Sequence, residues 1–182
     1  MKKIIYYVAS SLDGYIAGPE DDVSKFVESE DGIAQYLKDL KEFQTVIMGR
    51  KTYEFGYRFG LKPGQPAYPH MKHYIFSETL ELNPCSSQIT IVPLSIDRIL
   101  SLKQEATTDI YLCGGGQLAG WLLDHQLIDM VKIKLNPIIL GSGIPLFGNS
   151  QTAVISQLEE RASYDKGLEI LTYTLLYAKA SS

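Results

Sequence analysis

The sequence has few of the residues that hold small proteins together through covalent bonds or metal ions. Its 182 residues include two cysteines, Cys85 and Cys113, which form no CxxC pair and have no histidine at metal-ligand spacing. We therefore expect reduced thiols, a cytoplasmic location and no metal site. A signal peptide or a membrane span is not expected either, because the apolar run from Ile4 to Ala9 is far too short to cross a bilayer.

Clusters of positive charge are also missing. The formal net charge is −4, so the average electrostatic field of the protein repels nucleic acid. The GxSxG motif of serine hydrolases is absent as well. The apolar and charged fractions, 45% and 21%, are those of ordinary globular proteins. We expect residues 1–182 to form one domain that acts on a small molecule, without a nucleic-acid or membrane partner.

Short apolar runs alternate with helical patterns along the chain, and this order predicts an α/β fold. The predicted strands are 4–9, 45–48, 73–77, 88–92, 109–113 and 130–140, and the predicted helices are 31–43, 95–103 and two that start near 50 and 117. Segments 153–164 and 168–178 predict an antiparallel hairpin around a turn at 165–167. The pattern favours a mainly parallel central sheet with helices on its faces, closed by this C-terminal hairpin.

One predicted strand ends at Gly49 and is followed by Arg50, Lys51 and Thr52. Glycine lets a ligand approach the backbone, and the N-terminus of the next helix offers free N–H groups, which together suit a phosphate. Two cations beside a pyrophosphate site would favour NADPH over NADH through the additional 2′-phosphate. The alternative is a tight turn with solvated basic residues.

A second strand runs into three consecutive glycines, Gly114, Gly115 and Gly116. Each glycine costs about 0.5–1 kcal/mol relative to alanine in a regular element, so the run is best tolerated where side chains would collide with a neighbour. A pyrophosphate lying on the turn is such a neighbour. The motif is neither GxGxxG nor a P-loop. The alternative is a sharp turn with a close contact between helix and sheet.

The order of these motifs resembles the dihydrofolate reductase fold. Segments 48–54, 75–77 and 113–116 carry this likeness, while 11–18 (SLDGYIAG) and 136–147 (NPIILGSGIPLF) are similar to one branch of it. That branch contains the C-terminal reductase domain of the bifunctional riboflavin-biosynthesis enzyme and its stand-alone bacterial relatives. The resemblance covers almost the whole chain and implies a dihydrofolate-reductase-like three-layer fold, NADPH as hydride donor and a homodimer.

The resemblance also implies which residues bind the cofactor. Ser77 would lie near the adenosine ribose, and Ala9 and Ile16 would line the nicotinamide slot below a mobile loop. Glu78 departs from the pattern, because a carboxylate there weakens a preference for the 2′-phosphate. The residues implied to hold the phosphates and the nicotinamide ribose are Gly49, Arg50, Lys51, Thr52, Gly114, Gly115, Gly116 and Gln117.

A carboxylate on the first helix anchors the pterin in dihydrofolate reductases, and Asp31 is its nearest match here. We therefore expect Asp31 to be the catalytic acid, with an ordinary helix N-cap as its alternative role. Two features depart from a folate enzyme. Residues 24–26 replace the expected Pro-Trp pair, and 70–73 lacks an arginine for the glutamate tail.

Several charged and aromatic side chains are candidates for binding the substrate. A phosphorylated substrate needs cations, and the candidates are Lys72, His73, Arg58 and Lys62. Four tyrosines near the variable loop 56–70 form either an aromatic wall or ordinary packing: Tyr53, Tyr57, Tyr68 and Tyr74. Cys113 is expected to be a small buried hydrophobe.

Three functions follow, of which the first is favoured. The first is NADPH-dependent reduction of a C=N or C=O bond in a small heterocycle, pterin- or pyrimidine-like. The second is reduction of 5-amino-6-(5-phosphoribosylamino)uracil in riboflavin biosynthesis. The third is nucleotide binding without turnover.

Overall fold

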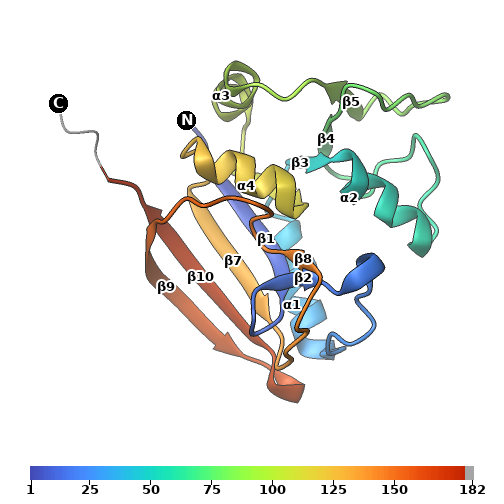
Figure 1. Ribbon diagram of the computed structural model, residues 1–182. Helices are drawn as coiled ribbons and strands as arrows, with labels where there is room; N and C mark the ends of the chain where they lie inside the picture. Colours follow the sequence, from blue (N-terminus) through green and yellow to red (C-terminus); the bar gives the residue numbers. More distant parts are fainter. Residues whose placement is uncertain (179–182) are drawn as a thin grey trace.

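The computed structural model describes residues 1–178 and has three layers, with one sheet between two sets of helices (Figure 1). Helices α1 (Glu30–Leu40) and α2 (Arg50–Phe55) cover one face of the sheet. Helices α3 (Ile96–Glu105) and α4 (Gly116–Asp124) cover the opposite face. Each pair of helices encloses its own apolar core against the sheet.

The central sheet has eight strands in the order β5-β4-β3-β6-β1-β7-β10-β9. Their bounds are β1 Ile4–Ser10, β3 Thr45–Gly49, β4 Lys72–Phe76, β5 Ile89–Val92, β6 Ile110–Gly114, β7 Met130–Leu135, β9 Ile155–Ser163 and β10 Glu169–Leu176. Neighbours from β5 to β7 are parallel, whereas β10 runs antiparallel to β7 and β9. This arrangement confirms the predicted mainly parallel α/β sheet with an antiparallel C-terminal hairpin.

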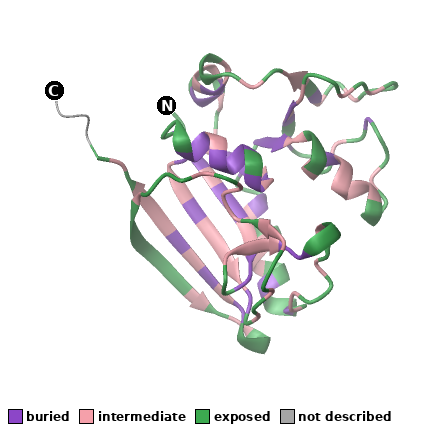
Figure 2. Ribbon diagram, in the orientation of Figure 1, coloured by how far each residue is buried: buried purple, intermediate pink, exposed green. Residues whose placement is uncertain are grey.

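The central strands are apolar throughout because helices cover both of their faces. In β1, Tyr6 packs with α3 and α4, and the next residue, Tyr7, packs with α1. The same alternation occurs in β6, and buried positions are concentrated in these central strands (Figure 2). Strand β9, at the edge of the sheet, is exposed along almost all of its length. A continuous apolar run therefore marks a central strand here.

The structure corrects two strand predictions. Strand β7 ends at Leu135 and not at residue 140, because Pro137 has no N–H with which to continue the ladder. A small antiparallel sheet of β2 (Tyr15–Ala17) and β8 (Ile144–Pro145) was expected to be loop. These two strands hold the loop after β1 against the segment after β7.

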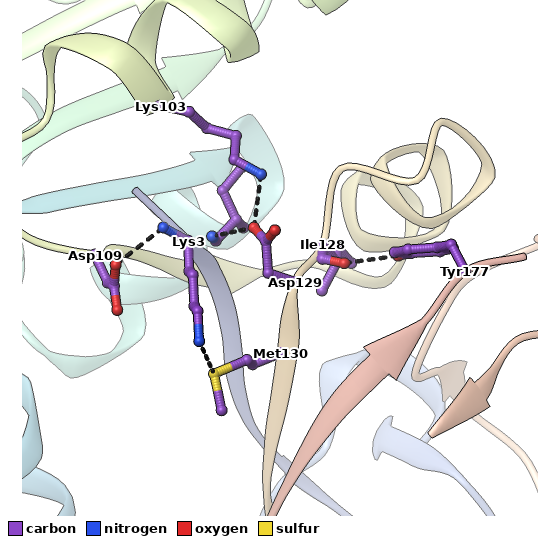
Figure 3. Close-up of polar contacts among 8 residues, drawn as sticks. Lys3, Lys103, Asp109, Ile128, Asp129, Met130 and Tyr177 are labelled. Atoms are coloured by element: carbon purple, nitrogen blue, oxygen red, sulfur yellow. Dashed lines mark hydrogen bonds and ion pairs between the residues drawn. The ribbon is translucent and has the colours of Figure 1, made fainter. Parts of the chain in front are cut away.

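The amino ends of the central strands are joined by Asp129 (Figure 3). Its Oδ2 accepts the Ile4 N–H at 2.7 Å and the Lys103 ammonium at 2.7 Å. Lys103 is buried, so this carboxylate is the acceptor that satisfies a charge from α3. Asp109 makes a lesser bond nearby, since it accepts the Lys3 N–H in an exposed position. Asp129 therefore ties β1 to α3.

Replacing Asp129 with alanine should lower the free energy of unfolding by about 1–3 kcal/mol, since the Lys103 ammonium would stay buried without an acceptor. Urea unfolding measures this loss. Asp109→Ala is the matched control and should lose less, because its single partner is reached by water. Equal losses in the two variants would contradict the role given to Asp129.

Candidate functional site

The two glycine-ended strands lie side by side. Strands β3 and β6 are parallel neighbours, with Met48 paired to Gly114. Each strand passes directly into a helix, β3 into α2 and β6 into α4. Both turns therefore open at the carboxyl edge of the sheet, where ligands bind in proteins of this architecture.

The glycine at the end of β3 leaves its backbone accessible from the side of the turn. A Cβ on Gly49 would meet nothing within 4 Å. A Cβ on Gly115 would lie 3.0 Å from the Thr52 hydroxyl oxygen, so Thr52 of α2 reaches the turn of β6. Neither Gly49 nor Gly115 has a side chain that could cap the helix after it. The first amides of α4 are therefore available to an anion.

The third glycine of the run serves a different purpose. A Cβ on Gly116 would lie 2.3 Å from the Pro145 carbonyl oxygen, and one on Gly120 would lie 2.3 Å from that of Phe147. Helix α4 therefore packs directly on the backbone of residues 145–147, at the end of β8 and just after it. For Gly116, the close packing contact offered as the alternative accounts for the missing side chain.

Arg50 is held at the mouth of the first turn. Its Nε donates to Glu54 Oε1 at 2.9 Å, and its Nη1 donates to Thr79 Oγ1 at 2.8 Å. The hydroxyl of Ser77 accepts the N–H groups of Thr79 and Leu80, which fixes the turn after β4. The structure thus brings Arg50 to the turn that Ser77 fixes, while Lys51 is exposed.

The loop after β1 is anchored by Asp13. Its carboxylate accepts the Ser11 hydroxyl at 2.6 Å and the N–H groups of Leu140 and Gly141 at 3.0 and 2.7 Å. These bonds lower the pKa of Asp13 to about 2, with the Ser11 bond as the largest cause. Ala9, before the loop, and Ile16, in β2, are both partly buried.

A second group of side chains lies on the α1 face of the sheet, and we call it the tyrosine–lysine cluster: Tyr36, Tyr68, Tyr111, Cys113 and Lys134. Tyr36 of α1 hydrogen-bonds to the Tyr111 hydroxyl at 2.8 Å. The Tyr68 hydroxyl lies 3.5 Å from Cys113 Sγ. The Lys134 ammonium is 3.6 Å from the centre of the Tyr36 ring, which is cation–π geometry.

Burial keeps most of this cluster uncharged. It raises the pKa of Tyr36 to about 12, and it also raises the pKa of Tyr68, Tyr111 and Cys113. Lys134 is the exception, because burial lowers the pKa of its ammonium to about 8. The cluster can therefore carry one positive charge near neutral pH.

Comparison with known proteins decides the family. Residues 2–170 match the family described as RibD C-terminal domain. The chain belongs to this family. An uncharacterized Bacillus subtilis protein, YwjB, is 33% identical over 153 residues, which cover 80% of this chain and 83% of YwjB. YyaP of the same organism is 25% identical, with 94% of each chain covered.

Solved structures show the same fold for this RibD C-terminal domain. A putative riboflavin biosynthesis protein of Shewanella sp. PV-4 aligns with a TM-score of 0.79 at 23% identity, covering 96% of this chain and 99% of that one. Dihydrofolate reductase of Enterococcus faecalis aligns with a TM-score of 0.63 at 15% identity, covering 95% and 96%. The dihydrofolate-reductase-like fold is thereby confirmed, and the family supports an oxidoreductase of the riboflavin-pathway type. No helix in residues 1–178 is long and apolar enough to span a membrane.

Asp31 contributes to a groove that includes no residue of the glycine turns. This open groove of about 510 Å³ lies between α1 and residues 163–165 at the end of the C-terminal hairpin. The N-cap role offered for Asp31 is wrong, because Ser29 caps α1 by accepting the Gly32 N–H at 3.0 Å. Its catalytic role stays a prediction that the geometry does not favour.

The candidate cations for a substrate phosphate differ in burial and in their partners. His73 is fully buried between the Met71 carbonyl and the Tyr68 N–H, and burial lowers its pKa to about 4. It is therefore neutral, and its assignment as a cation is wrong. Arg58 bonds to the Glu20 carbonyl, and Lys72 is exposed.

Sequence reasoning missed Lys134. Its signal was the alternation of lysine with apolar residues in β7, where Lys132 and Lys134 share a face. Alternation of this kind usually marks a solvated face, whereas here α1 covers the lysines. Cys113 was expected to be a small buried hydrophobe; the residue is half-buried, and burial of its thiol raises its pKa.

Alanine substitutions can distinguish a glycine beside open space, Gly49, from a glycine packed against protein backbone, Gly116. Gly116→Ala should lower the free energy of unfolding by about 1–3 kcal/mol, since the new methyl group meets the Pro145 backbone. Gly49→Ala should leave it unchanged, since its Cβ meets nothing. Thermal unfolding of both variants without ligand measures the difference. A Gly49→Ala variant as unstable as Gly116→Ala would show that the first turn has no open side.

Proposed function

We propose that this protein is an NADPH-dependent reductase that transfers a hydride to a C=N or C=O bond of a small, pterin- or pyrimidine-like heterocycle. The observation that carries the proposal is the adjacency of the β3 and β6 turns, with Thr52 between them and Arg50 at their mouth. Two uncapped turns in contact suit the diphosphate of one dinucleotide. Membership of the RibD C-terminal domain family supports the same chemistry.

The residues present fit this cofactor. The open side of Gly49 and the first amides of α4 would hold its phosphates, and the Gly115–Gln117 backbone would hold the pyrophosphate and the nicotinamide ribose. Arg50 and Ser77 would bind the adenosine end, and Arg50 would give the preference for a 2′-phosphate. The cofactor supplies the hydride, while Ala9 and Ile16 shape the slot that excludes water from its ring.

A narrower substrate is supported by the relatives. A Thermotoga maritima deaminase/5-amino-6-(5-phosphoribosylamino)uracil reductase aligns with a TM-score of 0.69 at 15% identity, with 57% of that chain covered. The same pyrimidine is a candidate substrate here. The neutral His73, and Arg58 bonded to the Glu20 carbonyl, favour a substrate without the phosphate. Cofactor binding without turnover of pyrimidines or pterins would indicate the non-catalytic alternative.

We also propose a homodimer in the cytoplasm, paired through the edge strand β9. This strand carries Ile155 and Leu158, which are 74% and 50% exposed. Exposed apolar side chains on an edge strand are a common basis for pairing between subunits. Sedimentation of the purified chain measures the oligomeric state.

Replacing Arg50 with alanine should weaken NADPH binding by about 1.5–3 kcal/mol through the loss of a charged hydrogen bond, and should change NADH binding less. Fluorescence titration with both cofactors measures the two affinities. Arg161→Ala, on β9, is a matched control that should leave both unchanged. Equal weakening of NADPH and NADH by Arg50→Ala would remove the 2′-phosphate role, and no affinity of the wild type for either cofactor would refute the proposed function.

A further inference from the structure

Two lysines on the same face of β7 have different surroundings. The Lys132 ammonium pairs with Asp39 Oδ2 at 2.7 Å, and the same carboxylate oxygen accepts the Tyr7 hydroxyl at 2.9 Å. Among the described residues, Lys134 has neither a carboxylate partner nor a hydrogen-bond acceptor. Within residues 1–178, no carboxylate lies within 4.0 Å of its ammonium and no acceptor lies within hydrogen-bond distance. A partly buried cation that lacks an acceptor is available to a ligand.

The position of Lys134 in the sheet places it beside the proposed cofactor slot. It is the register partner of Ala9 in β1, the residue assigned to that slot. It also lies close enough to Cys113, the last residue before the triglycine, for the two groups to affect each other's pKa. The ammonium therefore lies between α1 and strands β1 and β6, whose carboxyl ends border the proposed nicotinamide slot.

The groups that face Lys134 supply no competing charge. They are Tyr36 from α1, Tyr7 from β1 and Cys113 from β6, and all three have a raised pKa and are neutral near pH 7. From β10, the register partner is Ile170, which does not titrate. The carboxylate of Asp39, which contacts Tyr7, is already shared by Lys132 and Tyr7.

We propose that Lys134 is the proton donor of the reaction, and that its ammonium binds an electron-rich oxygen or nitrogen atom of a planar heterocyclic substrate. This inference rests on the proposed function. The aromatic rings around the ammonium suit a flat ring, and the single positive charge suits an anion or a carbonyl oxygen.

Atoms and electrons balance in this step if NADPH, the proposed cofactor, is the reductant and is oxidised to NADP⁺. A hydride adds to the carbon of a C=N or C=O bond, and the π electron pair of that bond moves to the nitrogen or oxygen. That atom takes one proton from Lys134 Nζ, which becomes a neutral amine and regains a proton from water. A pKa near 8 suits this role, because an acid with a pKa close to the working pH is both protonated and able to release its proton.

The first test needs neither cofactor nor substrate. In protein labelled with ¹³C at lysine Cε, one signal should titrate near pH 8 and be missing from the spectrum of Lys134→Met. Lys132→Met, the matched control, should keep that signal. If the signal that Lys134→Met removes titrates near the ordinary value of 10.5, the proposal is overturned.

Stability gives a second readout of the same group. The folded chain releases this proton near pH 8, whereas the unfolded chain keeps it up to about pH 10.5. At this lysine the unfolded state therefore binds more protons in this window, so the contribution of Lys134 to stability should rise between pH 8 and 10.5, while Cys113 and the buried tyrosines, whose pKa values are raised, act in the opposite direction. The contribution of Lys134 is measured as the difference in stability between the wild type and Lys134→Met at each pH. Lys134→Met should remove this rise and increase the melting temperature at pH 7. A decrease at pH 7 would mean that Lys134 is a structural residue.

A ligand then tests the binding role. Excess barbiturate, a planar pyrimidine monoanion, should raise the pKa of Lys134 in protein saturated with NADP⁺, and neutral uracil should raise it less. Lys134→Arg should keep barbiturate binding, and Lys134→Met should lose it. An unchanged Lys134 pKa in excess barbiturate would overturn the binding role.

Turnover separates this inference from the proposed function. With 5-amino-6-(5-phosphoribosylamino)uracil or dihydrofolate as substrate, Lys134→Met and Lys134→Arg should both lower kcat by about 10²–10⁴-fold, since arginine does not release a proton. Lys134→Arg should keep KM, and both variants should bind NADPH as the wild type does. Wild-type turnover that persists in Lys134→Met refutes the inference alone, whereas absent NADPH binding refutes the proposed function and leaves the titration result standing.

Discussion

Parallel pairing between β3 and β6 fixes the position of the whole candidate site. Because the two strands run in the same direction, their glycine turns and the helices that follow open at one edge of the sheet. The adjacent pairing of β1 with β6 and β7 brings Ala9 and Lys134 to that edge as well. Residues from distant parts of the chain are therefore gathered without a dedicated domain, as expected at the carboxyl ends of parallel strands.

Residues 136–148, which follow β7, also help to fix the structure of this edge of the sheet. Asp13 binds their backbone from the loop after β1, and α4 packs on them through Gly116 and Gly120. One run of glycines therefore serves two purposes. Gly115 lies beside Thr52 at the open turn, while Gly116 lets the helix approach the Pro145 carbonyl closely enough to cover the core. A triglycine need not indicate a ligand at each of its three positions.

The sequence predicted the central strands more accurately than the details that depend on distant contacts. The central strands were found because both of their faces are buried, which leaves a continuous apolar run. The cap of α1 was misplaced by two residues, since Ser29 and Asp31 are both good capping residues. Ser29 is favoured as the cap because its hydroxyl hydrogen-bonds to Asp165. Glycine is favoured at position 32 because a Cβ there would collide with Leu168. Both partners lie more than 100 residues away along the chain. No local pattern contains that information.

The same limit explains why the nucleotide half of the site was easier to predict than the substrate half. Glycine turns at strand ends are local features, and their order along the chain carries the family resemblance. The charge of Lys134 depends on α1 lying over β7, on Asp39 being occupied by Lys132, and on tyrosines that stay protonated.

Selection for stability favours pairing a half-buried ammonium such as that of Lys134 with a carboxylate, or replacing it with an apolar side chain. Lys132, two residues away, shows that β7 accommodates such a pair with α1. Keeping one paired and one unpaired lysine on the same face is a cost to stability, and costs of this kind are concentrated at functional sites. The unpaired ammonium is therefore explained more directly by a ligand than by packing.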